Sequence, residues 1–220
     1  MKKLLVFFVL FSILVTCSFA ETLYGASVNI ARLYEQFPKE NTGRDLNGTS
    51  FYIVLNHFPE DSALGWYIRT SIGGYGSGYE WKEGHKMENT HVNNSMDLRL
   101  SVGPSYAVRA GSMITIPISL GPVFTNYREG SSGFFWADTG FFETLNMGLL
   151  LDGAIIINPS KRFAIINGIT VNWDFLSWQK GNATFTYREI DNARFKYVNY
   201  NAFKIGYYFG LGMRFDNSDN

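Results

Sequence analysis

The chain has little of several features that define other classes of protein. Its single cysteine, Cys17, lies among the first 20 residues, so the remainder has neither a disulfide nor thiolate chemistry. Charged residues make up 17% of the chain and the formal net charge is zero, which removes the electrostatic case for a nucleic-acid partner. Beyond the first 20 residues, no apolar run reaches the roughly 18 residues that a membrane-spanning helix requires.

The first 20 residues predict a secretory signal peptide. Two lysines precede an apolar run from Leu4 to Val15, and Ala20 ends a small-residue cleavage site. We expect cleavage after Ala20, which leaves 21–220 as a single domain. The residues before Cys17 also resemble a lipoprotein box, with Thr16 where Gly, Ala or Ser is usual, so lipidation of Cys17 is an alternative.

The clearest pattern in the chain is a two-residue alternation, which is longest in Asn201–Phe215. One face of this segment is uniformly large and apolar, and the other is mostly glycine and cations. The faces are Phe203, Ile205, Tyr207, Phe209, Leu211, Met213 and Phe215, and Ala202, Lys204, Gly206, Tyr208, Gly210, Gly212 and Arg214. This period fits a strand, and a strand that is apolar outward and small or polar inward is typical of a membrane barrel.

Seven further segments alternate in the same way. They are 22–33, 51–58, 64–72, 96–103, 114–124, 144–152 and 165–175. We therefore predict an all-β protein, an eight-stranded antiparallel transmembrane β-barrel. A soluble sandwich or lipocalin-like barrel is the alternative, because its strands alternate too.

The connections between these segments alternate between long and short. The long ones are 35–50, 74–93, 128–140 and 177–199, and the short ones are 59–62, 109–112 and 158–161. Membrane barrels place short turns at the periplasm and longer loops outside. We expect four long outward loops, with both termini at the periplasmic side.

The leader, the eight strands, the rhythm of the connections and the aromatic-rich last strand resemble the small eight-stranded outer-membrane barrels of the OmpX, OmpW and OmpA-barrel group. In that group the terminal aromatic residue is typically the last one and is read by the barrel-assembly machinery. The resemblance implies this role for Phe215, although Asp216 to Asn220 follow it here. It also implies a bacterial outer-membrane location and contact with outer-membrane lipid.

The inward faces carry charges of both signs, which predict a polar network in the lumen. These residues are Arg69, Asp97, Arg99, Asp152, Asp174, Lys204 and Arg214. An eight-stranded barrel is just wide enough for side chains to fill, so the network either holds the wall together or lines a narrow conduit. The same face assignment predicts that Leu211→Arg costs about 2–4 kcal/mol near the bilayer midplane, and that Gly206→Ser on the inner face is milder.

Residues suited to catalysis or metal binding are sparse. The three histidines, His57, His85 and His91, have no metal-ligand spacing on one strand, so no metal or other cofactor is predicted. His85 and His91 share the second long loop with carboxylates and lie near Ser95, which leaves a lipid-modifying barrel enzyme as the least favoured reading. No Gly-x-Ser-x-Gly motif occurs.

Aromatic residues in the expected loops are candidates for partner contact. They are Tyr79 and Trp81 in the second loop and Phe134, Phe135 and Trp136 in the third. The alternative for such residues is an aromatic girdle at the level of the lipid headgroups. We expect a monomeric, non-enzymatic surface protein whose loops serve adhesion, partner binding or envelope integrity, with an extracellular ligand or a host surface as the candidate partner. A narrow conduit for small or hydrophobic solutes is the main alternative.

Overall fold

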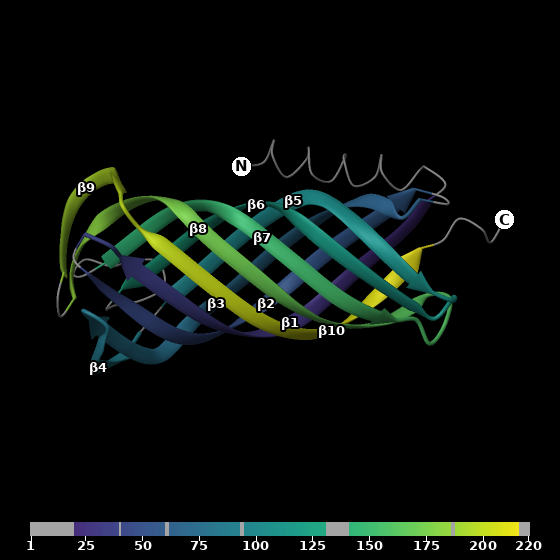
Figure 1. The fold of residues 1–220 in the computed structure, drawn as a ribbon, viewed down its shortest axis with the longest axis horizontal. Helices are drawn as coiled ribbons and strands as arrows, with labels where there is room; N and C mark the ends of the chain where they lie inside the picture. Colours follow the sequence, from purple (N-terminus) through teal and green to yellow (C-terminus); the bar gives the residue numbers. More distant parts are fainter. Residues whose placement is uncertain are drawn as a thin grey trace.

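The computed structural model describes residues 20–39, 41–59, 62–92, 95–130, 141–185 and 188–215. These residues form ten strands (Figure 1), which are β1 Ala20–Phe37, β2 Thr42–Pro59, β3 Leu64–Lys82, β4 His85–His91, β5 Ser95–Ala110, β6 Ile114–Gly130, β7 Phe141–Ile157, β8 Phe163–Phe185, β9 Arg188–Val198 and β10 Asn201–Phe215. Within the described ranges, no helix has the length and hydropathy that crossing a membrane would need.

Eight of the ten strands close into a barrel. Their order is β10-β1-β2-β3-β5-β6-β7-β8, and β8 pairs with β10 to complete the ring. Every pairing is antiparallel, and Ala20 and Phe215 lie at the same end as the turns after β2, β5 and β7. The predicted eight-stranded antiparallel barrel is confirmed.

The remaining two strands extend the barrel beyond its rim. β4 pairs with the end of β3, and β9 pairs with the end of β8. Figure 1 shows both at the same end of the molecule, the end opposite the short turns. The barrel therefore consists of two halves with one plan, β1 to β5 and β6 to β10, in which the third strand is prolonged and pairs with a short fourth strand.

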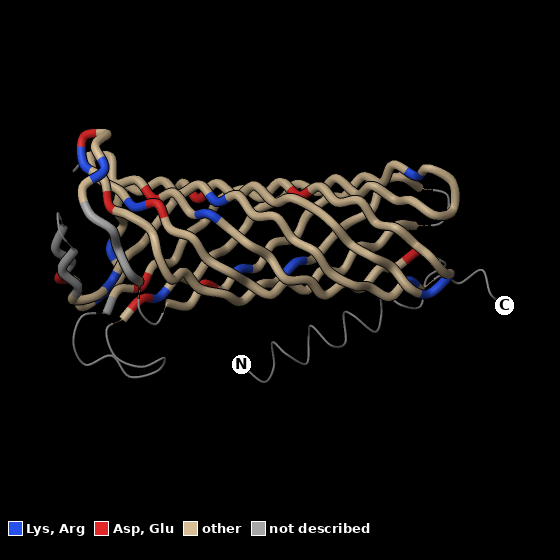
Figure 2. Tube along the Cα trace, turned by 90° about the horizontal axis from the view of Figure 1, so that it is seen from below, with Lys and Arg blue, Asp and Glu red and all other residues tan. Residues whose placement is uncertain are grey.

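The outer wall is apolar, as the alternation predicts. On β10 every second side chain from Phe203 to Phe215 is exposed, and the residues between them are mostly buried. The same holds for β1, where Val28 and Ile30 are exposed and their neighbours Ser27 and Asn29 are buried. Exposed apolar side chains in a continuous band around a closed barrel are what a bilayer requires. Figure 2 shows charged residues concentrated at the β4 and β9 end, with few along the wall.

The connections at that end differ from the prediction of four long loops. The first consists of residues 38–41 alone, because 35–37 and 42–50 are paired strand. The second and fourth are largely the β3–β4 and β8–β9 hairpins, and the third, 131–140, lies outside the described residues. The strands continue above the apolar band, where both faces are polar, and sequence alternation is lost there. The three short turns are confirmed.

Candidate functional site

The lumen brings together six of the seven predicted inward charges. Arg69, Asp97, Arg99, Asp152, Asp174 and Lys204 are all buried, although they come from five different strands. They form two adjoining groups along the barrel axis. The seventh residue, Arg214, lies apart at the turn end, where its Nε is 3.3 Å from a carboxylate oxygen of Glu21.

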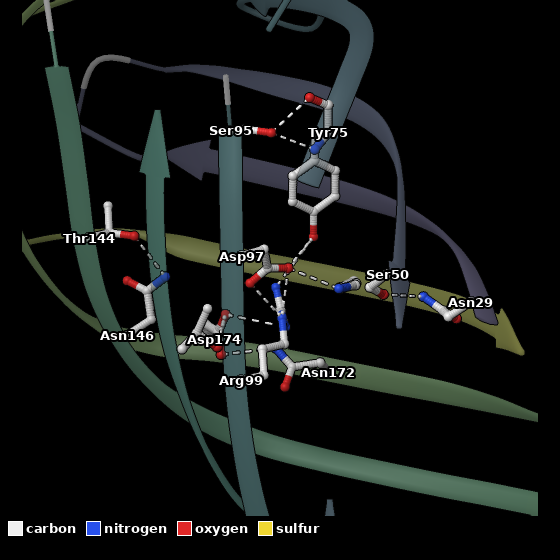
Figure 3. Close-up of polar contacts among 12 residues, drawn as sticks. Asn29, Ser50, Tyr75, Ser95, Asp97, Arg99, Thr144, Asn146, Asn172 and Asp174 are labelled. Carbon is white, nitrogen blue, oxygen red and sulfur yellow. Dashed lines mark hydrogen bonds and ion pairs between the residues drawn. The ribbon is translucent and has the colours of Figure 1, made fainter. Parts of the chain in front are cut away.

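The first group is centred on the carboxylate of Asp97. Lys204 Nζ donates to its Oδ2 at 2.9 Å, Tyr75 donates its hydroxyl at 2.8 Å, and Arg99 donates from Nε at 3.0 Å. The Arg99 guanidinium also lies 3.9 Å from Asp174, which accepts a hydrogen bond from Asn172. Figure 3 shows Arg99 between the two carboxylates and Tyr75 reaching down to Asp97. We call Asp97, Arg99, Asp174 and Lys204 the ionic layer.

The second group joins β3, β7 and β10 across the lumen. Arg69 Nη2 donates to Asp152 and lies 3.0 Å from the Tyr208 hydroxyl, which itself donates to Asp152 at 2.9 Å. The guanidinium carbon lies over the rings of Tyr52 and Tyr208, 5.1 and 4.7 Å from the two centroids, and the two rings pack edge to face. Towards the turns, both tyrosines join an apolar cluster that includes Leu23, Ile156, Ala164 and Ile166.

A third buried group lies near the rim at the β4 and β9 end, and the sequence prediction missed it. Arg44 donates to Glu35 at 2.8 Å and to Glu129 at 2.7 Å. Tyr200 donates to Glu35 and Tyr127 to Glu129, each at 2.7 Å. Glu35 and Arg44 fall in a stretch that was predicted to be a loop. The sequence therefore did not predict that their side chains point into the barrel. The pairing of β1 with β2 up to Phe37 was the missing information.

These groups fill the lumen over most of its length. Asp97, Asp174 and Tyr208 are each 1% exposed, and Asn29 is fully buried, although all four point inward from the wall. A water-filled passage would leave such side chains accessible to solvent. At the level of the described lumen residues the barrel is therefore a packed interior, as small eight-stranded barrels allow.

Two of the five aromatic residues predicted to contact a partner, Tyr79 and Trp81, lie on a strand and contact neighbouring side chains. Tyr79 donates its hydroxyl to Asp45 at 2.9 Å, and Trp81 stacks on Tyr34 with ring centroids 5.5 Å apart. Both belong to β3, above the apolar band. Phe134, Phe135 and Trp136 lie outside the described residues. Phe215 is exposed at the end of β10, with its ring edge-on to Tyr24 at 5.6 Å.

Tyr79 and Trp81 are part of an outward-facing cluster at the edge of the band, which we call the first rim cluster. Its members are Arg32, Tyr34, Asp45, Tyr79, Trp81 and Lys86. Arg32 donates from Nε and Nη2 to the two oxygens of Asp45, at 2.7 and 2.5 Å, and Lys86 Nζ lies 4.8 Å from the centre of the Tyr79 ring. Burial alone would raise the pKa of Asp45, but the hydrogen bonds from Arg32 and Tyr79 outweigh it and hold that pKa below its usual range.

A second rim cluster repeats this arrangement on β6 to β9. Its members are Asn126, Arg128, Glu143, Trp178, Lys180 and Tyr197. Glu143 accepts from Arg128 at 2.9 Å and Asn126 at 2.9 Å, and Lys180 Nζ lies 2.8 Å from its other oxygen. Burial raises the pKa of Glu143, and these hydrogen bonds, with that of Lys180 the strongest, bring it below its usual range. Trp178 and Tyr197 pack edge to face at 6.3 Å.

The residues considered for catalysis are not arranged as a catalytic group among the described side chains. Ser95 Oγ donates to the carbonyl of Tyr75 at 2.8 Å and accepts from the Tyr75 amide at 2.6 Å, so the backbone uses both roles of the hydroxyl (Figure 3). His85 is exposed on β4, and the side chain of His91 is outside the described part. Within that part, no group of three or more potential ligand residues is placed to hold a metal ion.

Comparison with solved structures confirms the resemblance to small outer-membrane barrels. OprG from Pseudomonas aeruginosa superposes with a TM-score of 0.54 at 10% identity, covering 90% of this chain and 97% of that one. Neisserial surface protein A superposes with a TM-score of 0.52 at 10% identity, covering 88% of this chain and 97% of that one. No protein-family model and no curated protein matches the chain. The chain thus has the architecture of an integral outer-membrane β-barrel.

Proposed function

We propose that this protein is a non-enzymatic barrel of a bacterial outer membrane, closed along its axis, whose function is exerted by the surface that it presents outside the cell. Export by a leader cleaved after Ala20 and insertion by the barrel-assembly machinery through Phe215 belong to the same proposal. The observation that carries it is the packed lumen. A wall whose interior is occupied by ion pairs and aromatic rings is a rigid support rather than a conduit.

The outward end supplies the surface. The β3–β4 and β8–β9 hairpins continue the strands of the wall beyond the apolar band, so they are held in fixed positions rather than as separate loops. They expose long side chains, among them the apolar Met87 on β4 and the cationic and aromatic Arg194, Lys196 and Tyr197 on β9. Aromatic and cationic side chains on a rigid support are suited to binding a macromolecule, because little conformational entropy is lost on contact.

Single-channel recording tests the closed lumen. We expect the refolded wild-type protein in planar bilayers to show no stable conductance step. The variant Asp97→Ala with Arg99→Ala and Lys204→Ala removes most of the ionic layer but leaves the Arg69 group and the apolar cluster in place, so it should not conduct either. An open porin recorded in the same bilayers verifies that the assay detects an open barrel. Stable conductance or uptake of small solutes by the wild type would overturn the proposal in favour of the conduit.

Adhesion measurements test the role of the outward end. Cells that display the protein are applied to surfaces coated with purified collagen, fibronectin or laminin. The variant Arg194→Ser with Lys196→Ser and Tyr197→Ser should reduce adhesion at least about tenfold, which corresponds to the loss of one hot-spot interaction. Arg109→Ala at the opposite end is the matched control. Equal adhesion of cells with and without the protein, on all three surfaces, would contradict the adhesive role.

A further inference from the structure

The two rim clusters occupy equivalent places in the two halves of the barrel. In the ring, β1, β2 and β3 are separated from β6, β7 and β8 by the single strands β5 and β10. In each cluster an arginine on the first strand and a carboxylate on the second form a salt bridge, a tryptophan lies on the third, and a lysine completes the group. The clusters therefore face opposite sides of the molecule, and both contain an arginine, a lysine, a carboxylate, a tryptophan and a tyrosine.

Both clusters lie where the apolar wall ends. Arg32 follows Ile30 on the outward face of β1, and Ile30 is 68% exposed. Glu143 precedes Leu145 on the outward face of β7, and Leu145 is 39% exposed. Side chains one step above a lipid-facing residue are at the depth of the lipid headgroups, because alternate residues on a tilted strand are only about 5 Å apart along the membrane normal.

The cations of both clusters have N–H groups that are not hydrogen-bonded to the carboxylate of the cluster. In the second cluster Glu143 pairs with both Arg128 and Lys180, whereas in the first Asp45 pairs with Arg32 alone and Lys86 lies over the Tyr79 ring. Each cluster therefore holds two cations and one carboxylate, which leaves an excess of positive charge. The carboxylate side chains are 7% exposed in both cases, whereas the Arg32 and Arg128 side chains are 63% and 52% exposed. A buried carboxylate that fixes one edge of an exposed guanidinium leaves its other N–H groups directed outward. Such a fork is suited to the oxygens of a phosphate.

We propose that each rim cluster binds the phosphate group of an anionic membrane lipid. Arg32 and Lys86 bind one phosphate in the first cluster, and Arg128 and Lys180 bind another in the second. Asp45 positions Arg32, and Glu143 positions Arg128 and Lys180, without touching the lipid. Tyr34, which stacks on the buried Trp81, and Trp178 are exposed on the outer face and lie against the lipid at the interface, where aromatic side chains are favoured. This inference does not depend on the proposed function, because it holds for an open or a closed barrel.

Native mass spectrometry of the refolded protein in detergent tests the inference. The probes are lipid A, phosphatidylglycerol and zwitterionic phosphatidylcholine. We expect the wild type to retain up to two anionic lipids and few of the zwitterionic ones. Arg32→Ala with Lys86→Ala, or Arg128→Ala with Lys180→Ala, should each weaken one site about 30-fold, at about fivefold per cation removed, and leave the other site unchanged. The quadruple variant should retain no more anionic lipid than zwitterionic lipid.

The controls separate the lipid site from general charge and from misfolding. Arg109→Ala removes an exposed arginine at the turn end and should leave lipid retention unchanged. A shift in electrophoretic mobility on boiling verifies that each variant is folded, and Arg32→Lys with Arg128→Lys keeps the charge but should weaken binding by loss of the planar fork. Preference for lipid A over phosphatidylglycerol assigns the site to a glycolipid phosphate, and equal retention assigns it to lipid phosphates in general. Undiminished retention by the quadruple variant, or equally strong binding of inorganic phosphate alone, would overturn the assignment.

Discussion

The ionic layer and the rim clusters are built from the same groups, but they differ in burial. Asp97 is 1% exposed and all its partners are buried with it, so every charge in the layer is already committed within the barrel. Asp45 is also nearly buried, yet its partner Arg32 is 63% exposed. The difference indicates that the inner pairs stabilise the wall and that the outer pairs remain available to bind a partner.

The largest expected effect is the loss of stability when a charge of the ionic layer is removed. Asp97→Asn leaves Lys204 and Arg99 buried without their main anion, and losing one member of a buried pair costs about 3–5 kcal/mol. Urea unfolding of the refolded protein in detergent measures the loss. Adding Lys204→Met should restore part of the stability, because the second change removes the uncompensated charge. A double variant less stable than Asp97→Asn alone would show that the layer is not balanced as described.

The next largest loss of stability is expected for a charge placed on the lipid-facing side of the barrel wall. Leu211 is exposed on β10 and faces lipid, so Leu211→Arg should cost about 2–4 kcal/mol near the bilayer midplane in refolding into lipid vesicles. Gly153→Ala on β7 is the mild counterpart, because no heavy atom lies within 4 Å of its Cβ position. If Leu211→Arg unfolded at the same denaturant concentration as the wild type, β10 could not face lipid there.

The structure narrows the expected difference in cost between Gly206→Ser and Leu211→Arg. A Cβ at position 206 overlaps the carboxamide of Asn29, which is fully buried and donates to Ser50 at 3.0 Å. The inner face is packed rather than wet, so adding even a small side chain displaces a neighbour. We now expect Gly206→Ser to cost about 1–3 kcal/mol, within the range of overpacked cores.

The sequence was sufficient for the eight wall strands because the lipid imposes a strict alternation on them. Above the apolar band the outer face of the strands is polar as well, so the sequence does not alternate there. It therefore did not predict a strand with Asp45, Asn47 and Thr49 on its outer face. A register shift between β2 and β3 at Asn47 and Gly48 also reverses the parity of β3 beyond that point. Tyr79 and Trp81 consequently lie outside the barrel, where counting from Arg69 would have placed them inside.

The two-residue alternation predicts which charged side chains point into the barrel, but it does not predict which of them form pairs. Arg69 and Asp152 are on strands that are not neighbours in the ring, and their hydrogen bond crosses the lumen. Which charges meet depends on strand tilt and register, which the pattern of one strand does not contain. The rim clusters could not be predicted for the same reason, since each joins four strands above the alternating region.

A smaller loss of stability is expected when the carboxylate of the first rim cluster is removed. The pKa of Asp45 is lower in the folded protein than in the unfolded chain, so its stabilisation is fully present above the unfolded value of about 3.9 and is lost as the pH falls through the folded value. Asp45→Asn should therefore destabilise the protein by about 1 kcal/mol at pH 7, and the difference from the wild type should shrink below about pH 4. Urea midpoints at pH 7, 5 and 3 measure this. A difference that stays constant down to pH 3 would contradict a paired carboxylate.

The smallest effect is expected for the ion pair at the turn end, where neither lumen nor headgroup encloses the charges. Arg109 lies 3.2 Å from Glu21 and donates to the carbonyl of Ser62 at 3.0 Å, but its side chain is 34% exposed. Exposed pairs contribute little because water solvates both partners nearly as well, so Arg109→Ala should cost no more than about 0.5 kcal/mol. Half of that small difference should disappear on raising the salt concentration from 0.05 to 0.5 M, because screening acts on exposed charges. A loss comparable to that of Asp97→Asn would mean that exposure does not separate structural from available pairs in this barrel.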